Sequence, residues 1–374
     1  MSATKIEWCD EVFNPLVGCS KCSPGCDNCY AERRAAMLAR NPNPQIEAKY
    51  AGVVDANGKW TGKLNFQLGW FHDAAQRLQG KPRKSIFIGS MTDIFYQPPK
   101  ENWRFVPLPG QGMFPGRDYS KEDVYPQADF FFDLVAGWDI ITGLGHEVIF
   151  LTKRPDQMRL ILHGIGMCAP FDTVHGYGNC VDRMQKNTIL MTTVCNQDEA
   201  NEKIPQLLAI PGKWKRGVSI EPMLGPVDFH LNGPVGQTLH ALTGDYSENP
   251  TAHLSALGAP ELDLGIRLRA TVSSLNWVIC GGETGPGARP MHPGWVRSLR
   301  DQCVAASVPF FFKGWGAWIP AQMHSNGKFG TWHNGIFLDG FVDTEDLSVN
   351  MCRFKGKASG HRLLDGREWN EEPV

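Results

Sequence analysis

The feature that most constrains this chain is a cysteine-rich loop near its N-terminus. Residues 18–30 read Gly-Cys-Ser-Lys-Cys-Ser-Pro-Gly-Cys-Asp-Asn-Cys-Tyr and contain Cys19, Cys22, Cys26 and Cys29, four of the chain's eleven cysteines. Two disulfides inside so short a loop would be strained, and thiolates clustered in this way usually bind zinc or an iron–sulfur cluster. The loop therefore predicts a metal centre around which the rest of the chain is organised.

The spacing of the cysteines bears on which metal is bound. Structural zinc sites usually pair two Cys-x2-Cys knuckles across a spacer of roughly 12 to 20 residues, whereas only three residues separate Cys22 from Cys26. Three of these thiolates can hold three corners of a cubane cluster and leave the fourth iron open. Ferredoxin runs differ in order and end in Cys-Pro, while Tyr30 follows Cys29. We expect a three-thiolate cluster; the alternatives are zinc or an electron-transfer cluster, and unliganded thiols.

Length and charge set broad limits on the protein. A chain of 374 residues can form one large α/β domain or two ordinary domains. The net charge of −2 provides no overall basic field to attract nucleic acid, although a local groove remains compatible with it. The N-terminus has no apolar signal region, and no apolar run approaches the ~20 residues that cross a bilayer. We therefore expect a cytoplasmic protein without a membrane partner, whose remaining cysteines are mostly buried free thiols.

Short apolar runs that end in polar residues recur along the chain. Such runs suit strands that are buried on both faces of a parallel sheet. We predict strands at 85–91, 147–151, 188–194, 216–220, 276–280 and 308–312. Residues 30–40, which follow Cys29, are rich in helix formers and should form the helix that closes the cysteine loop. Further helices are predicted at 67–80, 126–145, 155–163, 197–209 and 293–306.

The alternation of strands and helices predicts an α/β fold. A full or partial TIM-type (β/α) barrel is the first choice and a doubly wound open sheet the second, and both place their site at the carboxyl ends of the strands. Residues 1–320 are predicted to form the barrel domain, and 321–374 a C-terminal capping extension with a turn and hairpin. The stretches 98–125, 164–187 and 229–274 fit no repeat and are interpreted as insertions over the barrel mouth.

Several sequence motifs carry a family resemblance that spans nearly the whole chain apart from the insertions. They are Ile6-Glu-Trp, Asn14-Pro15, Gly18-Cys19, Ser23-Pro-Gly-Cys-Asp-Asn-Cys-Tyr-Ala, Leu151-Thr-Lys-Arg-Pro, Ser219-Ile-Glu-Pro-Met-Leu-Gly-Pro, Gly281-Gly-Glu-Thr-Gly-Pro-Gly-Ala-Arg-Pro-Met-His-Pro, Phe311-Phe-Lys-Gly-Trp-Gly and Leu363-Leu-Asp-Gly-Arg. With these motifs the chain resembles the phage and prophage three-cysteine-motif family, which is grouped with radical S-adenosylmethionine (SAM) proteins. The resemblance implies a barrel of the radical SAM kind, a [4Fe–4S] cluster, SAM as cofactor, and an external electron donor.

Two overlapping cysteine triads are compatible with this resemblance. Cys22, Cys26 and Cys29 have the Cys-x3-Cys-x2-Cys spacing of radical SAM enzymes at large. The nearer family is spaced Cys-x6-Cys-x2-Cys, which selects Cys19, Cys26 and Cys29, and the position of Cys22 is usually apolar there. We favour the triad with Cys19, since relatives without Cys22 would still need three ligands, and treat Cys22 as a spare or substitute ligand.

Polar residues at the predicted strand ends are the other candidate site residues. Gly281, Gly282 and Glu283 resemble the Gly-Gly-Glu-like segment that holds the SAM amino group in radical SAM enzymes, although that segment follows an earlier strand there. The alternative is a flexible glycine loop without a ligand. Glu221 ends another strand, and an unpaired Glu is rarely a core residue.

Basic and acidic residues at other strand ends complete the candidate set. Lys153 and Arg154 could bind the SAM carboxylate or a substrate phosphate, or only a helix end. Together with Glu221 we assign them to catalysis, and Asp93 to cofactor binding. Arg289 and His292 follow the glycine loop; His292 is a candidate either for substrate contact or for capping the next helix.

No Ser-His-Asp set, Walker-type phosphate loop or His-Glu-x-x-His helix occurs in the sequence, which excludes the common hydrolase and kinase classes. The function predicted is that of a radical SAM enzyme, in which the reduced cluster cleaves SAM to a 5′-deoxyadenosyl radical. The phage setting implied by the resemblance favours a nucleic-acid base or a nucleotide as substrate. The alternative is a zinc- or cluster-stabilised nucleic-acid-binding or interaction protein without enzymatic activity.

Overall fold

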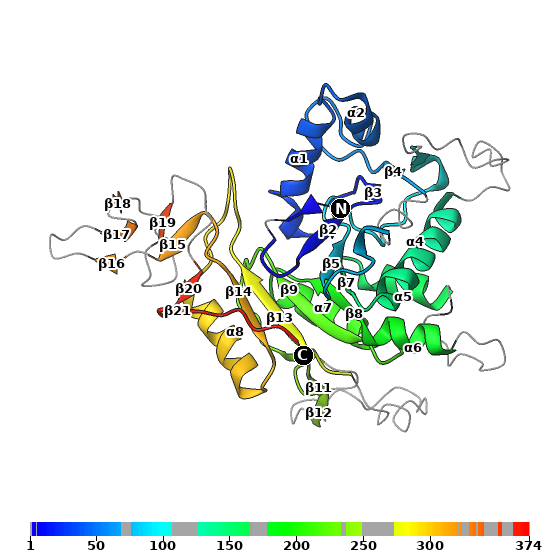
Figure 1. The fold of residues 1–374 in the computed structure, drawn as a ribbon. Coiled ribbons are helices and arrows are strands. Elements are labelled where there is room, and N and C mark those ends of the chain that lie inside the picture. Colours follow the sequence, from blue (N-terminus) through cyan, green and yellow to red (C-terminus); the bar gives the residue numbers. More distant parts are fainter. Residues whose placement is uncertain are drawn as a thin grey trace, which may run out of the picture. The chain divides into compact units, whose positions relative to one another are not determined.

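The computed structural model describes residues 2–4, 6–68, 76–106, 126–164, 166, 178–232, 237–248, 273–320, 322–323, 329–333, 336–339, 351–353 and 362–373. The chain forms two compact units, whose elements are labelled along the chain in Figure 1. Unit 1 comprises Met1–Met191 and Ile210–Lys215, and unit 2 comprises Thr192–Ala209 and Arg216–Val374.

Unit 1 is built on a largely parallel sheet with the strand order β1-β2-β5-β7-β8. Strand β1 pairs with β2 antiparallel, while β2, β5 and β7 run parallel to one another. A second, three-stranded sheet has the order β3-β4-β6. The bounds are β1 Ser2–Ala3, β2 Glu11–Phe13, β3 Leu16–Val17, β4 Leu64–Phe66, β5 Ser85–Ile88, β6 Trp103–Phe105, β7 Glu147–Thr152 and β8 Thr188–Thr193, the last two residues of β8 belonging to unit 2.

The helices of unit 1 often begin at proline, which lacks the N–H that a first helical residue would leave unbonded. Proline is the first residue of α2, α4 and α5, and the N-cap Asn43 of α2 accepts a hydrogen bond from Gln45 N at 2.9 Å. The bounds are η1 Pro24–Cys26, α1 Tyr30–Leu38, α2 Pro44–Tyr50, η2 Lys100–Asn102, α4 Pro126–Gly143, α5 Pro155–Gly164 and α6 Gly178–Lys186.

The core of unit 1 lies between the sheet and α4. The buried Trp138 of α4 meets Phe150 of β7 edge-on, with ring centroids 5.0 Å apart. Its indole N–H donates to Thr188 Oγ1 of β8 at 2.8 Å, so that a polar atom carried into the core is satisfied. These contacts fix β7 and β8, and hence the residues that follow β7.

Unit 2 continues the same pattern with the strand order β8-β9-β13-β14. Strand β13 pairs parallel with both β9 and β14. Almost every residue of these strands is buried, and Phe310 and Phe312 of β14 have no exposed surface. The main elements are α7 Gln197–Leu208, β9 Lys215–Ile220 (Lys215 itself in unit 1), β13 Trp277–Gly281, α8 Pro293–Ala305 and β14 Phe310–Gly314.

Small antiparallel sheets complete unit 2. Strands β10 His230–Asn232, β11 Gln237–His240 and β12 Asp245–Glu248 form one of them, and β16 Gln322–Met323, β17 Phe329–His333 and β18 Ile336–Asp339 form another. Strand β15 Trp318–Pro320 pairs with β19 Met351–Arg353, and β20 Leu363–Leu364 with β21 Arg367–Glu368. The last pair confirms a hairpin in the C-terminal stretch.

The parallel strands and most helices confirm the α/β prediction. All six predicted apolar runs contain a strand, and the helices predicted from 126, 155, 197 and 293 begin at those residues. The fold is therefore mixed α/β with parallel strands in the βα order, and it is compatible with a partial TIM-type barrel. Half of the predicted helix 67–80, and large parts of the stretches 98–125, 164–187 and 229–274, lie outside the described residues. Among the helices that are described, none is long and apolar enough to cross a bilayer.

Candidate functional site

The cysteine loop in unit 1 begins at a glycine that no other residue could replace without strain. Gly18 directly follows β3 and has φ of 105°, and a Cβ atom built on it would lie 2.1 Å from the carbonyl oxygen of Lys63. Its own carbonyl oxygen accepts a hydrogen bond from Thr92 Oγ1 at 2.5 Å. The chain is thereby held against the segment that follows β5 at the point where the loop begins.

Short helices hold the rest of the loop. Ser23 caps η1, since its Oγ accepts a hydrogen bond from Gly25 N at 3.1 Å. Helix α1 begins at Tyr30, with Cys29 as its N-cap residue. Unbonded N–H groups at a helix N-terminus carry a partial positive charge, which favours an anionic group nearby. The predicted helix that closes the loop is confirmed.

The thiols of Cys19, Cys22 and Cys26 interact with one another. Cys22 and Cys26 are hydrogen-bonded, and this bond raises the pKa of the Cys22 thiol and, with the nearby Lys153 ammonium, lowers the pKa of Cys26 to about 5. Burial raises the pKa of Cys19 to about 12, and the charge of Asp93 acts in the same direction. Cys26 is thus the thiol that most readily supplies the thiolate that metals bind.

Cys29 has a different environment. It packs against a buried apolar cluster of unit 1 that includes Ala31, Ala35, Tyr50 and Met91. Among the described residues, no three His, Cys, Asp or Glu side chains are already grouped to hold a metal ion. The hydrogen bond between Cys22 and Cys26 joins two thiols of the loop, and both predicted triads also require the thiol of Cys29 at the start of α1.

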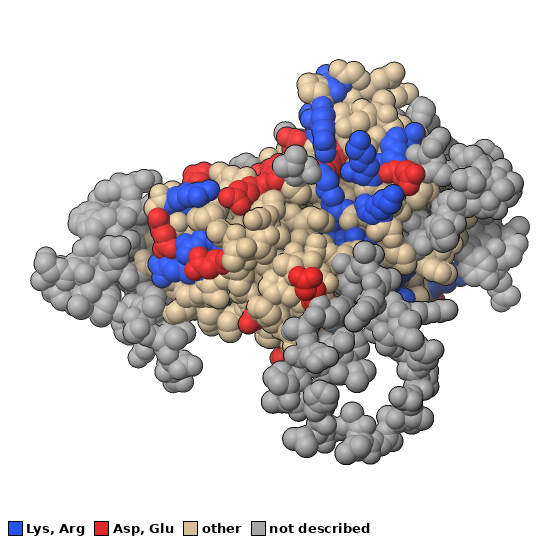
Figure 2. Space-filling model, turned by 90° about the horizontal axis from the view of Figure 1, so that it is seen from below, with Lys and Arg blue, Asp and Glu red and all other residues tan. Residues whose placement is uncertain are grey.

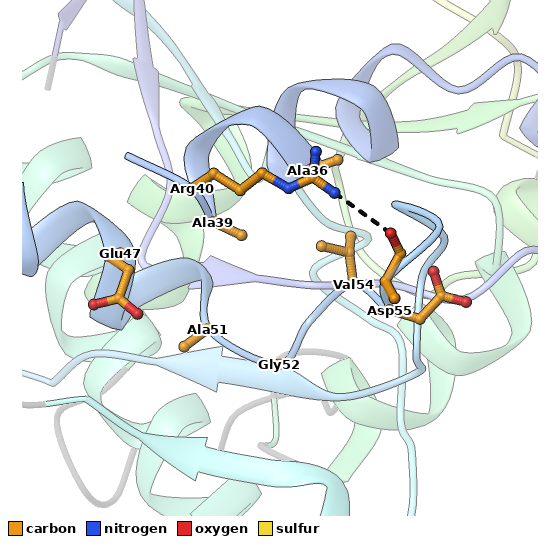
Figure 3. Close-up of a pocket in the computed structure, with 9 residues that line it drawn as sticks. Ala36, Ala39, Arg40, Glu47, Ala51, Gly52, Val54 and Asp55 are labelled. Atoms are coloured by element: carbon orange, nitrogen blue, oxygen red, sulfur yellow. Dashed lines mark hydrogen bonds between the residues drawn. The ribbon is translucent and has the colours of Figure 1, made fainter. Parts of the chain in front are cut away.

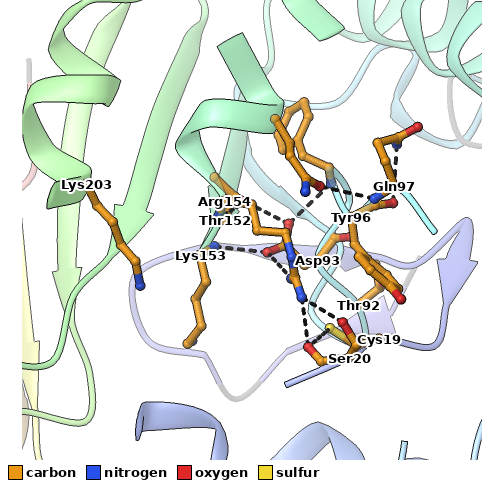
Figure 4. Close-up of polar contacts among 12 residues, drawn as sticks. Cys19, Ser20, Thr92, Asp93, Tyr96, Gln97, Thr152, Lys153, Arg154 and Lys203 are labelled. Atoms are coloured by element: carbon orange, nitrogen blue, oxygen red, sulfur yellow. Dashed lines mark hydrogen bonds and ion pairs between the residues drawn. The ribbon is translucent and has the colours of Figure 1, made fainter. Parts of the chain in front are cut away.

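Asp93, Arg154 and Ser20 form a buried network that fixes the loop (Figure 4). Arg154 Nη1 donates to Asp93 Oδ2 at 3.0 Å, and Arg154 Nη2 donates to both the carbonyl oxygen and Oγ of Ser20 at 2.9 Å. The side chains of Arg154 and Asp93 are only 9% and 8% exposed, and the guanidinium lies 4.6 Å from the centre of the Tyr96 ring. One arginine therefore links the residues after β5 and β7 to the cysteine loop.

Asp93 accepts further hydrogen bonds from the end of β7. Thr152 Oγ1 donates to Asp93 Oδ1 at 2.6 Å, and Lys153 N donates to Asp93 Oδ2 at 3.0 Å. Phe95 N also donates to Asp93 Oδ1, at 3.2 Å. The predicted residues Asp93, Lys153 and Arg154 thus lie with the cysteine loop in unit 1. Ser20 and Thr152 were not predicted, because no pattern in the sequence marks a serine between cysteines or a threonine at a strand end as a network partner.

In unit 2, Glu221 follows β9 and forms an ion pair with Lys313 of β14. Gly281, at the end of β13 between these two strands, leaves room for both: its hypothetical Cβ would lie 3.3 Å from Lys313 Cβ and 3.6 Å from Glu221 Cδ. The ion pair is partly exposed, at 25% for Glu221 and 32% for Lys313. The sequence predicted Glu221 as a strand-end residue but gave no sign that it pairs with Lys313.

The carboxylate of Glu283 accepts three hydrogen bonds from Arg289. Arg289 donates to it through Nε at 2.9 Å, Nη2 at 2.7 Å and the backbone N at 2.8 Å. Such a bidentate pair is among the stronger charge-assisted contacts in proteins. A SAM amino group would have to share this carboxylate with Arg289, so the role predicted for Glu283 stays a prediction.

Gly282 has a packing role. A Cβ on it would lie 2.1 Å from the carbonyl oxygen of Trp315, and one on Gly316 would lie 2.3 Å from the carbonyl oxygen of Glu283. The two backbone segments are hydrogen-bonded, from Gly282 N to Gly314 O at 2.9 Å. His292 is the N-cap of α8, since its Nδ1 accepts from Gly294 N at 3.0 Å, which confirms the capping alternative.

A hollow of about 340 Å³ lies beside α1 and α2 in unit 1 (Figure 3). Its lining is mostly small, with Ala36, Ala39, Ala51 and Gly52 among the residues. Arg40 Nη2 donates to the carbonyl oxygen of Ala56 across one side, at 3.4 Å. None of the predicted site residues lines this hollow.

Comparison with known proteins gives a family but no characterised relative. Neither a curated protein nor a solved structure matches the sequence. The family described as protein of unknown function (DUF5131) matches residues 3–106 and 128–373, which include the cysteine loop and every predicted site residue. The chain therefore belongs to the DUF5131 family.

Proposed function

We propose that the cysteine loop binds an iron–sulfur cluster and that the protein is a radical SAM enzyme. The observation that carries the proposal is the hydrogen bond between the Cys22 and Cys26 thiols, in a loop whose thiols interact with the charges of Arg154 and Lys153. Soft thiolates suit an iron–sulfur cluster. A cubane held by thiolates is anionic, and these cations together with the N-terminus of α1 supply charge of the opposite sign.

The donor set fits a cluster with three protein ligands. Cys26, which belongs to both triads and whose pKa is lowered to about 5, is the first ligand. Cys29 at the start of α1 is the second, and either Cys19 or Cys22 is the third. A cluster held by these residues and reduced by an external donor would supply the electron that cleaves bound SAM.

The protein's own residues orient the loop and the ligands. Arg154 holds the loop backbone at Ser20 and is itself held by Asp93, so we assign these two residues to positioning. Lys153 stays a candidate for the SAM carboxylate or a substrate phosphate. In unit 2 Glu221, which is held in an ion pair with Lys313, stays a candidate catalytic residue at the carboxyl end of β9.

A nucleotide or nucleic acid is the substrate class that we propose. Helix α1, which closes the cysteine loop, exposes Arg33 and Arg34, and Arg40, two residues after the end of the helix, is exposed as well. Lysine and arginine side chains also gather on part of the face shown in Figure 2, although the net charge of the chain is −2. Arginine binds phosphate through paired hydrogen bonds, and exposed arginines near a site therefore favour a phosphate-bearing substrate.

Anaerobic reconstitution tests the proposal. The purified chain is supplied with iron and sulfide, and iron, sulfide and zinc are counted; dithionite and SAM are then added and 5′-deoxyadenosine is measured. We expect about four irons per chain, with loss of the cluster in Cys26→Ala and in only one of Cys19→Ala and Cys22→Ala. Zinc in place of iron would favour the non-enzymatic alternative. A stable cluster without formation of 5′-deoxyadenosine would refute the SAM reaction, but it would still support the proposed cluster site.

A further inference from the structure

A small sheet in unit 2 places two histidines and an aspartate side by side. In the register of β10, β11 and β12, His230 lies opposite His240, and His240 lies opposite Asp245. Directly opposed residues on antiparallel strands point to the same face of a sheet. The three side chains therefore form a row across three strands, which is not part of the function proposed above.

The two histidines occupy the closer kind of cross-strand pair. Ala241 N donates to Phe229 O at 2.9 Å, so the neighbouring pair 229 and 241 is hydrogen-bonded. Hydrogen-bonded and non-hydrogen-bonded pairs alternate along an antiparallel ladder, which makes His230 and His240 a non-hydrogen-bonded pair with side chains close together. Their ring centroids are 4.4 Å apart, with the ring planes at 88°.

Asp228 orients the first histidine for metal binding. Its Oδ1 lies 2.7 Å from His230 Nδ1 and also accepts from His230 N at 2.9 Å. When Nδ1 carries the proton that is donated to Asp228, the lone pair of His230 is on Nε2. A carboxylate that accepts from one imidazole nitrogen while the other nitrogen binds metal is the usual arrangement around histidine ligands.

The second histidine has an unsatisfied nitrogen. Within the described part of the chain, His240 Nδ1 is a buried atom without a hydrogen-bond partner. A buried polar atom left unpaired is destabilising, so a ligand that bonds to it would be stabilising. His230, by contrast, is 54% exposed at its side chain, which leaves a path to solvent for an entering ion.

We propose that His230 and His240 bind a divalent transition-metal ion such as Zn²⁺, with Asp245 as the third protein ligand. Imidazole nitrogen and carboxylate oxygen are common zinc ligands. The three side chains are not yet grouped round one point in the described structure, so the rings turn about their side-chain bonds on binding and Asp245, which is exposed, rotates toward them. Water would complete the coordination.

Titration of the full-length chain with Zn²⁺, followed by calorimetry, tests this site. Because cysteine thiols are themselves zinc ligands, each variant is compared with wild type for the loss of one zinc equivalent. We expect His240→Gln and His230→Gln to lose that equivalent. Asp228→Asn should keep it with an affinity lower by about 10- to 100-fold, the usual effect of losing a carboxylate behind a histidine ligand. His163→Gln, which alters an exposed histidine of α5, is the matched control and should change nothing.

Cobalt identifies the ligands independently. Co²⁺ bound to thiolates has a charge-transfer absorption that Co²⁺ bound only to imidazole and carboxylate lacks. The equivalent that disappears in His240→Gln should therefore lack this absorption, and circular dichroism should show both histidine variants folded. The proposal is overturned if wild type, His240→Gln and His230→Gln bind the same number of Zn²⁺ equivalents with the same affinity. Cluster assembly on the cysteines should be unaffected by either variant, so the two proposals fail separately.

Discussion

Removing the charge of Asp93 should destabilise unit 1 and loosen the cysteine loop. Asp93 and Arg154 are less than a tenth exposed, and their ion pair is 3.0 Å long. Breaking a buried pair by removing one partner typically costs about 3–5 kcal/mol, because the other charge stays buried without compensation. Asp93→Asn keeps the size of the side chain, so we expect a loss of about 3–5 kcal/mol in the free energy of unfolding.

A double-mutant cycle separates the pair from the rest of the network. Arg154→Met removes the contacts to Asp93 and Ser20 but leaves Asp93 its donors at Thr152 and Lys153. Groups in one network usually show coupling energies of about 0.5–3 kcal/mol, and we expect this pair to lie in the upper half of that range. The cycle is measured by urea unfolding, and hydrogen exchange of the loop peptide is measured for each variant.

The control is an ion pair of the same chemistry at the surface of unit 1. Arg183 of α6 pairs with Asp139 of α4, and their side chains are 42% and 34% exposed. Exposed pairs contribute about 0–1 kcal/mol, so Arg183→Met should be close to wild type in stability. A loss below 1 kcal/mol for Asp93→Asn, with no coupling to Arg154 and unchanged exchange in the loop, would refute the positioning role.

Other predictions concern backbone packing and a buried amine. Gly282→Ala should lower the free energy of unfolding in urea by at least about 2 kcal/mol, because the new methyl would lie 2.1 Å from the Trp315 carbonyl oxygen. In the control Gly225→Ala the nearest contact is at 3.4 Å, so its stability should stay within about 1 kcal/mol of wild type. Equal effects of the two substitutions would contradict the packing role of Gly282. Burial lowers the pKa of Lys49 from 10.5 to about 8, so the unfolded chain binds more protons between these pH values and the free energy of unfolding should gain a contribution as pH rises through this range. Lys49→Met should remove that contribution, which is about 3 kcal/mol for a shift of this size. Identical pH profiles in both proteins would show that the amine is not desolvated.

The sequence predicted the strands of the parallel sheet well because their burial leaves a strong signal. Runs such as 147–151 and 276–280 carry apolar residues at consecutive positions, which is the pattern expected of a strand that is buried on both faces. The helices with initial proline, such as α8, were also placed well, since proline favours the first turn. The same signals carry no information on how the chain divides into two compact units, because a buried strand has the same apolar sequence pattern in either unit.

The sequence predicted which residues belong to the candidate site, but not which residues they contact. That Glu221, Glu283 and Arg154 lie at carboxyl ends of strands follows from the order of apolar and polar residues. Their partners do not follow, because Glu221 meets Lys313 across 92 positions and Arg154 meets Ser20 across 134. The role of Gly282 was likewise hidden, since a glycine needed for backbone contact and a glycine needed for ligand approach look the same in a sequence.

These contacts change what a substitution at the strand ends would mean. A charged residue that already has a partner, as Glu283 has in Arg289, leaves the opposite charge without that partner when it is replaced. Loss of activity in Glu283→Ala alone would therefore not distinguish ligand binding from lost structure. Replacing both members of the pair by residues of similar shape removes both charges together, and any loss of SAM affinity that remains can then be assigned to the site. The same reasoning applies to Asp93 with Arg154 and to Glu221 with Lys313, so the function proposed for these strand ends is tested by pairs rather than by single residues.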